Sequence, residues 1–272
     1  MSTAERALRD GDLHAALADL QAQVKQAPAK AELRVFLFQL LSVMGQWDRA
    51  LTQLDVAADL DAGALAMKQM YREAIQCERL RAEVFAGRTS PLIFGEPEPW
   101  LALLIEALLV TGTPRAREAA GLRARAFEEA PPSAGTLDDQ PFQWIADADM
   151  RLGPVCEAVI NGRYYWLPFA RLARVDIEAP ADLRDVVWMP AHFEFTNGGE
   201  AVGVIPTRYP GTEAADGPGL RLARRTEWRE DAPELFVGLG QRVLTTDVGE
   251  HSLMDIRSIR FETPAAAQDA HG

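Results

Sequence analysis

The chain has 272 residues, of which 48% are hydrophobic and 25% are charged, a composition typical of a globular protein that is long enough for two domains. Its formal net charge is −12, and an acidic chain is a poor electrostatic match for nucleic acid or for an anionic membrane surface. The sequence therefore favours protein partners, and we expect neither nucleic-acid binding nor membrane insertion.

The first 14 residues have neither the basic region nor the apolar region of a signal peptide. The longest apolar run, residues 101–105, is too short to cross a bilayer. The two cysteines, Cys77 and Cys156, lie far apart and in no metal-ligand spacing. We expect a cytoplasmic protein with no cofactor.

Residues 1–130 are predicted to be helical, because apolar residues recur there at intervals of three and four positions. The segment that begins at Gly11 aligns with the segment that begins at Gly45, an offset of 34 residues, which is the period of tetratricopeptide repeats. Each glycine would lie at the turn between two helices, and Ala16 and Ala50 would let the paired helices approach closely. We expect a tetratricopeptide-like array, with generic helical hairpins at a chance offset as the alternative.

The rest of the helical region is predicted to contain a helix over residues 64–86, a Pro/Gly-rich connection over 87–99, a helix over 100–110 and one more helix that ends before Pro131. Residues 131–141 are predicted to be the linker between two domains.

Residues 142–263 are predicted to form an antiparallel, β-rich domain that is barrel-like. Asn161-Gly162 lies between two strand-like runs, which is the strongest short signal for a hairpin. A second hairpin is predicted around residues 197–199. The fold class is therefore α+β, and residues 264–272 are predicted to be a disordered tail.

A dense polar cluster contains Asp147, Asp149 and Glu157, close to Arg151. Paired carboxylates can bind a divalent cation or perform acid–base chemistry. They can equally form salt bridges within the fold, which is the interpretation we favour. His192-Phe-Glu194 resembles the start of a deaminase zinc motif, but no cysteine follows Cys156 to supply the other ligands. The sequence contains no P-loop, dinucleotide-binding or serine-nucleophile motif, so it does not predict an enzyme.

Many of these segments together resemble the ImpE/TagJ family, the accessory proteins of bacterial type VI secretion systems. One of them is the run Phe-Gln-Trp-Ile-Ala-Asp-Ala-Asp-Met-Arg-Leu-Gly-Pro at residues 142–154. The other matching segments are residues 8–13, 36–41, 45–51, 161–165, 182–188, 206–213, 226–228 and 238–242.

The resemblance implies a helical first domain, a β-rich second domain and a non-catalytic role beside the contractile sheath. It implies two partners, the small sheath subunit (TssB) and the sheath-recycling AAA+ ATPase (ClpV). An N-terminal segment of about residues 1–17, with Leu8 and Leu13, would meet the ATPase. The repeat register separately predicts a peptide-binding groove lined by Val35, Gln39, Gln69 and Glu73. The alternative function is a metal-binding or enzymatic β domain centred on the Asp147 cluster.

Overall fold

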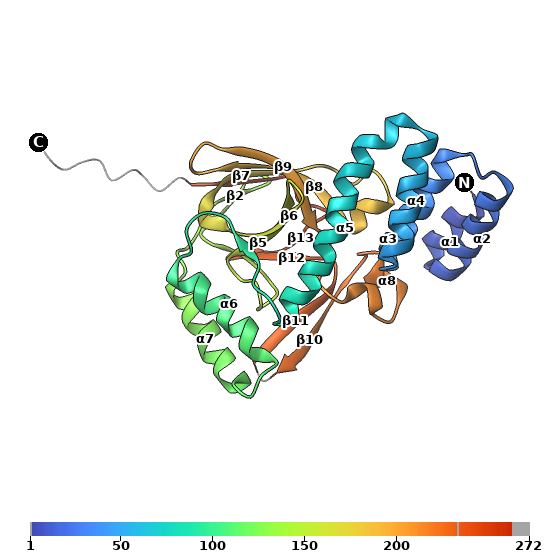
Figure 1. Cartoon of the computed structure of the whole chain (residues 1–272). Helices are drawn as coiled ribbons and strands as arrows, with labels where there is room; N and C mark the ends of the chain where they lie inside the picture. The colour runs from blue at the N-terminus through green and yellow to red at the C-terminus, as the bar shows by residue number, and fades with distance from the viewer. Residues whose placement is uncertain (1, 233, 263–272) are drawn as a thin grey trace, which may run out of the picture.

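The computed structural model describes residues 2–232 and 234–262, which form a helical region followed by a β-rich region (Figure 1). The α+β class predicted from the sequence is confirmed. The predicted disordered tail, residues 264–272, lies outside the described residues. The helices are α1 (Thr3–Asp10), α2 (Leu13–Gln26), α3 (Ala31–Val43), α4 (Trp47–Leu60), α5 (Leu65–Phe85), α6 (Pro99–Thr111), α7 (Ala116–Glu129) and α8 (Pro218–Arg221).

The first four helices form two antiparallel pairs, α1–α2 and α3–α4, in the places that the 34-residue offset predicts. Gly11 and Gly45 lie at the two turns with φ of 84° and 67°, a conformation that favours glycine. Ala16 and Ala50 are completely buried, as close helix packing requires. The repeat pattern therefore has the structural basis expected from the sequence.

The array does not continue to residue 130. Helix α5 follows α4, but the α6–α7 hairpin lies at the far end of α5, away from α1 and α2 (Figure 1). A short strand, β1 (Leu92–Ile93), separates α5 from α6 and pairs with the main sheet. Among the described helices, none is both long and apolar enough to cross a bilayer.

The main sheet has nine strands in the order β1-β6-β5-β9-β8-β7-β14-β2-β3, and smaller sheets are formed by β10-β11 and β13-β12-β4. The strands after α7 are β2 (Gly135–Leu137), β3 (Gln140–Phe142), β4 (Ile145–Asp147), β5 (Val155–Ile160), β6 (Arg163–Pro168), β7 (Leu172–Ile177), β8 (Trp188–Phe195), β9 (Glu200–Pro206), β10 (Thr226–Ala232), β11 (Leu235–Gly240), β12 (Val243–Thr246), β13 (Gly249–Ser252) and β14 (Ser258–Phe261).

Two departures from the predicted barrel-like domain follow from this strand order. In the described part of the chain the sheet is open, because its edge strands β1 and β3 pair with one neighbour each. The sheet is also mixed, because β1 runs parallel to β6. Both predicted hairpins are present as β5–β6 and β8–β9. At the first hairpin, Asn161 and Gly162 both have positive φ, as a two-residue turn requires.

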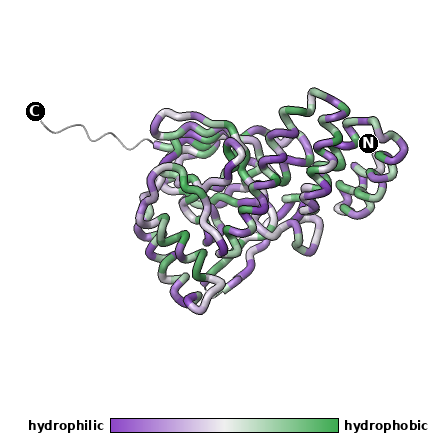
Figure 2. Tube along the Cα trace, in the orientation of Figure 1, coloured by the Kyte–Doolittle hydropathy of each residue, from purple (hydrophilic) through white to green (hydrophobic). Residues whose placement is uncertain are grey.

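The sheet separates two apolar cores. Its outer face contributes Tyr164, Trp166 and Trp188 to a core shared with the helices. Its inner face contributes Phe193 and Phe195 to a second core enclosed by the strands. Figure 2 shows hydrophobic residues along the strands of the sheet and along α6. Because α5 packs on only part of the outer face, the remainder of that face is left open beside the helix.

Candidate functional site: a groove between α5 and the sheet

A buried network of charges attaches α5 to the sheet. Arg81 on α5 donates to Glu157 on β5 through Nε at 2.7 Å and Nη2 at 3.0 Å. Arg242 joins the same carboxylate to Asp147, and the hydroxyl of Tyr164 also donates to Glu157. Arg81 and Arg242 are only 4% and 1% exposed. Buried charges of this kind require their partners, so the network fixes the position of α5 on the sheet.

The electrostatics of the two central carboxylates differ. Burial alone would raise the pKa of Glu157, but Arg81 and Arg242 outweigh burial and lower it to about 2. Burial raises the pKa of Asp147 to about 6, with Arg242 opposing that rise. The difference has a simple cause, because Glu157 faces two guanidinium groups and Asp147 bonds to one.

The three carboxylates that the sequence offered as a metal or catalytic cluster are therefore already occupied by protein donors. Asp149 accepts hydrogen bonds from Arg151 and from the backbone N–H of Gly238 at 3.0 Å. Asp147 accepts from Arg242, from the backbone N–H of Asp149 and from the hydroxyl of Tyr209. This arrangement favours the salt-bridge interpretation of the cluster. The sequence did not identify Arg81 and Arg242 as partners, since both lie more than 70 residues away from Glu157.

An aromatic cluster also packs α5 against the sheet and against α3. The ring of Tyr71 lies 5.6 Å from the ring of Trp188 and 5.8 Å from that of Phe38, measured between centroids. The indole N–H of Trp188 donates to Glu78 at 3.0 Å. Aromatic contacts and hydrogen bonds together make the junction between α5 and the sheet rigid.

Beside this junction lies a groove of about 870 Å³. One wall is the first half of α5, with Met67, Gln69, Met70 and Glu73, and the other is the outer face of the sheet. The sheet side includes Val159, Asp176, Pro190, His192, Val202 and Val204. Val202 is 71% exposed and adds apolar surface to the sheet side of the groove. The groove therefore combines apolar side chains with charged ones, as binding sites for protein segments do.

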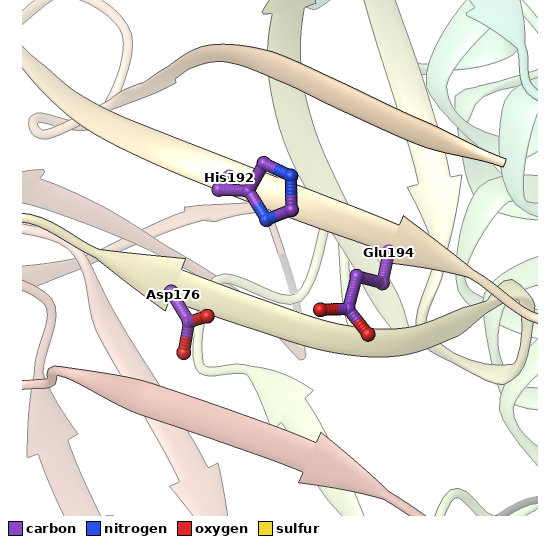
Figure 3. Close-up of side chains that lie close together, drawn as sticks. All are labelled: Asp176, His192 and Glu194. Carbon is purple, nitrogen blue, oxygen red and sulfur yellow. The ribbon is translucent and has the colours of Figure 1, made fainter.

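A polar ladder continues from the groove along the outer face of β7, β8 and β9. Asp176 lies opposite His192 in the strand register, and Glu194 lies opposite Glu200. Figure 3 shows Asp176 on one strand and His192 and Glu194 on its neighbour, with the three side chains close together. The alternation of β8, which buries Phe193 and Phe195 on the inner face, places His192 and Glu194 outward. The sequence pattern pointed to His192 and Glu194, whereas the proximity of Asp176 became visible only from the strand register.

The six residues predicted to contact partners divide into two groups. Gln69 and Glu73 line the groove and hydrogen-bond to each other. Leu8, Leu13 and Gln39 are buried, and Val35 is half-buried. The predicted contact role of Leu8 and Leu13 does not fit their position, because both pack inside the helical array.

Helix α1 is held in place at both of its ends. Ser2 and Glu5 form a capping box at its start, and Arg224 donates to the carbonyl oxygens of Leu8 and Arg9 at its end. The predicted ATPase-binding segment is thus part of the folded array.

Comparison with known proteins agrees with this architecture. The family model described as "ImpE protein" matches residues 139–260. Over 259 residues the chain is 49% identical to the type VI secretion system accessory component TagJ of Pseudomonas aeruginosa, covering 95% of this chain and 91% of that protein. The chain belongs to the ImpE family.

The fold of this ImpE-family protein also has a match among solved structures. The crystal structure of protein VPA1032 from Vibrio parahaemolyticus superposes with a TM-score of 0.87, covering 97% of this chain and 99% of that chain. At 24% sequence identity the likeness supports the fold alone. Helical pairs followed by a β-rich region are thus found together in an experimental structure.

Proposed function

We propose that this ImpE-family chain is a non-catalytic, cytoplasmic accessory protein of a type VI secretion system. In this role it binds the small sheath subunit TssB, the ATPase ClpV, or both. The similarity to TagJ over 95% of the chain supports the system and the accessory role. The observation that carries the binding role is the groove between α5 and the sheet, with Val202 exposed in its lining.

The chemistry of the groove suits a segment of another protein. Met70 and Val202 offer exposed apolar surface, and the carboxylates of Glu73, Asp176 and Glu178 line the same hollow. An amphipathic segment with basic side chains would bury its apolar face against Met70 and Val202. It would place its positive charges near the three carboxylates. We assign this groove to a segment of TssB.

A non-catalytic role is supported by the Asp147, Asp149 and Glu157 cluster. Its carboxylates are bound by arginine and tyrosine side chains, as in a salt-bridge network within the fold. The alternative of an enzymatic domain centred on these residues gains no support from the geometry.

The test uses the full-length chain, because Arg81 of α5 depends on Glu157 of the sheet. Affinities for purified TssB and for the N-terminal domain of ClpV are measured by biolayer interferometry with wild type, Val202→Glu and Val248→Glu. Val248 is the matched control, an exposed valine (56%) outside the groove lining. We expect wild type and Val248→Glu to bind TssB with equal affinity. Val202→Glu should bind at least about tenfold more weakly, because a carboxylate would replace an apolar side chain that is buried in the complex.

The outcomes separate the two parts of the proposal. If Val202→Glu binds TssB as tightly as wild type does, the groove is not the binding surface. If the wild-type chain binds neither TssB nor ClpV, the adaptor function itself is wrong.

A further inference from the structure

Three metal-ligating side chains meet on the outer face of β7 and β8. A ligand atom from each of Asp176, His192 and Glu194 lies within 4.8 Å of the other two (Figure 3). All three side chains are half-buried. We propose that these residues form a binding site for a divalent transition metal of the zinc class.

The strand register builds this donor set on a stable framework. Asp176 and His192 are directly paired across β7 and β8, and Glu194 is two residues further along the same face. Phe193 and Phe195, which alternate with them, are buried in the inner core and fix the backbone of β8. Donors on paired strands are positioned more precisely than donors on loops.

The surroundings of Asp176 resemble the outer shell of a metal site. Ser258 on β14 donates its hydroxyl to Asp176 Oδ1 at 2.8 Å. Such hydrogen bonds orient a ligating carboxylate. Glu200 lies 3.3 Å from His192 Nε2 and offers a further oxygen at the edge of the site.

Arg174 is also a competitor for the metal. Its guanidinium lies 3.9 Å from Glu194 and contacts Asp176, so it partly neutralises the two carboxylates that a cation would bind. A cation must compete with this charge. Removal of the Arg174 charge should therefore strengthen metal binding. If the cluster were only a structural salt bridge, the same change would leave the carboxylates unpaired and create no metal affinity.

The donor set selects the class of metal. One imidazole with two carboxylates suits zinc and related transition metals, while calcium and magnesium prefer all-oxygen sites. In a tetrahedral zinc site the ligand atoms lie about 3.3 Å apart, and the three ligand atoms here lie within 4.8 Å of one another. Asp176 and His192 also line the groove, so a metal held by them would lie at its edge.

The experiment measures Zn²⁺ binding to the tag-free, full-length chain by isothermal titration calorimetry, with Mg²⁺ and Ca²⁺ for comparison. We expect one Zn²⁺ per chain, a higher melting temperature with Zn²⁺, and little response to Mg²⁺ or Ca²⁺. His192→Ala and Glu194→Gln should each weaken Zn²⁺ binding by about tenfold or more. Arg174→Gln should tighten it. His14→Ala, which removes an exposed histidine of α2, is the control and should bind as wild type does.

Circular dichroism establishes that each variant is folded before titration. Equal Zn²⁺ affinity in wild type and His192→Ala would overturn the proposal, since any binding would then be adventitious. Unchanged or weaker binding by Arg174→Gln would also contradict it.

Discussion

The buried carboxylate of Glu157 allows a quantitative test of how α5 is held on the sheet. In Glu157→Gln the side-chain volume is nearly unchanged, so the change removes charge without creating a cavity. Arg81 keeps the carbonyl oxygen of Arg208 and a long contact to Glu78, and Arg242 keeps Asp147. Each arginine nevertheless loses its bond to a full negative charge.

Two estimates of the cost agree. Removal of one partner from a buried ion pair costs about 3–5 kcal/mol. The fall in the pKa of Glu157 from 4.5 to about 2 corresponds to about 3 kcal/mol of stabilisation of the charged form. We therefore expect Glu157→Gln to lower the free energy of unfolding by about 3 kcal/mol at pH 7.

The assay is urea denaturation followed by far-UV circular dichroism and by tryptophan fluorescence. Fluorescence reports on the junction directly, because Trp166 bonds to Tyr164 within the network and Trp188 bonds to Glu78. Glu83→Gln is the control, since Glu83 pairs with Arg88 at the surface and its loss should leave the transition midpoint unchanged. A loss below about 1 kcal/mol for Glu157→Gln would refute the claim that this ion pair stabilises the junction.

Two further predictions concern pH and backbone packing. Because the pKa of Glu157 is lowered in the folded state, the stabilisation by its charge is present above pH 4.5 and is lost as pH falls toward about 2. The difference in unfolding free energy between wild type and Glu157→Gln should therefore shrink below pH 4.5. A constant difference in urea titrations from pH 7 to pH 3 would contradict this. Gly203→Ala should destabilise the protein by about 1–3 kcal/mol in thermal and urea melts, because the new Cβ would lie 2.4 Å from the carbonyl oxygen of Val159. Gly121 lies in α7, and a Cβ there would meet no atom within 4 Å, so Gly121→Ala should instead stabilise the protein by about 0.5–1 kcal/mol. Equal effects of Gly203→Ala and Gly121→Ala would contradict the packing argument.

The helix pairs could be predicted because their signals are local. The glycines at positions 11 and 45 adopt positive φ, and the small residues that follow them are buried, so the repeat pattern directly reflects backbone conformation and packing. The hairpin at Asn161-Gly162 was predictable for the same reason, since its turn is specified by two adjacent residues.

The open sheet and the candidate sites depend on contacts between distant parts of the chain. The parallel pairing of β1 with β6 joins residues about 70 positions apart, and no local pattern encodes it. Residue type favours burial of Leu8 and Leu13, which were predicted as contact residues from the family resemblance and instead pack inside the array.

The sequence by itself determined the α+β class, the two helix pairs, the two hairpins and the family resemblance, because each depends on local periodicity, turn chemistry or ordered motifs. Only the tertiary structure decided that Glu157 pairs with Arg81 and Arg242, that α5 leaves part of the sheet uncovered, and that Asp176 lies opposite His192. The physical reason is that charge pairing and groove formation depend on distances in space, and sequence separation does not fix these distances.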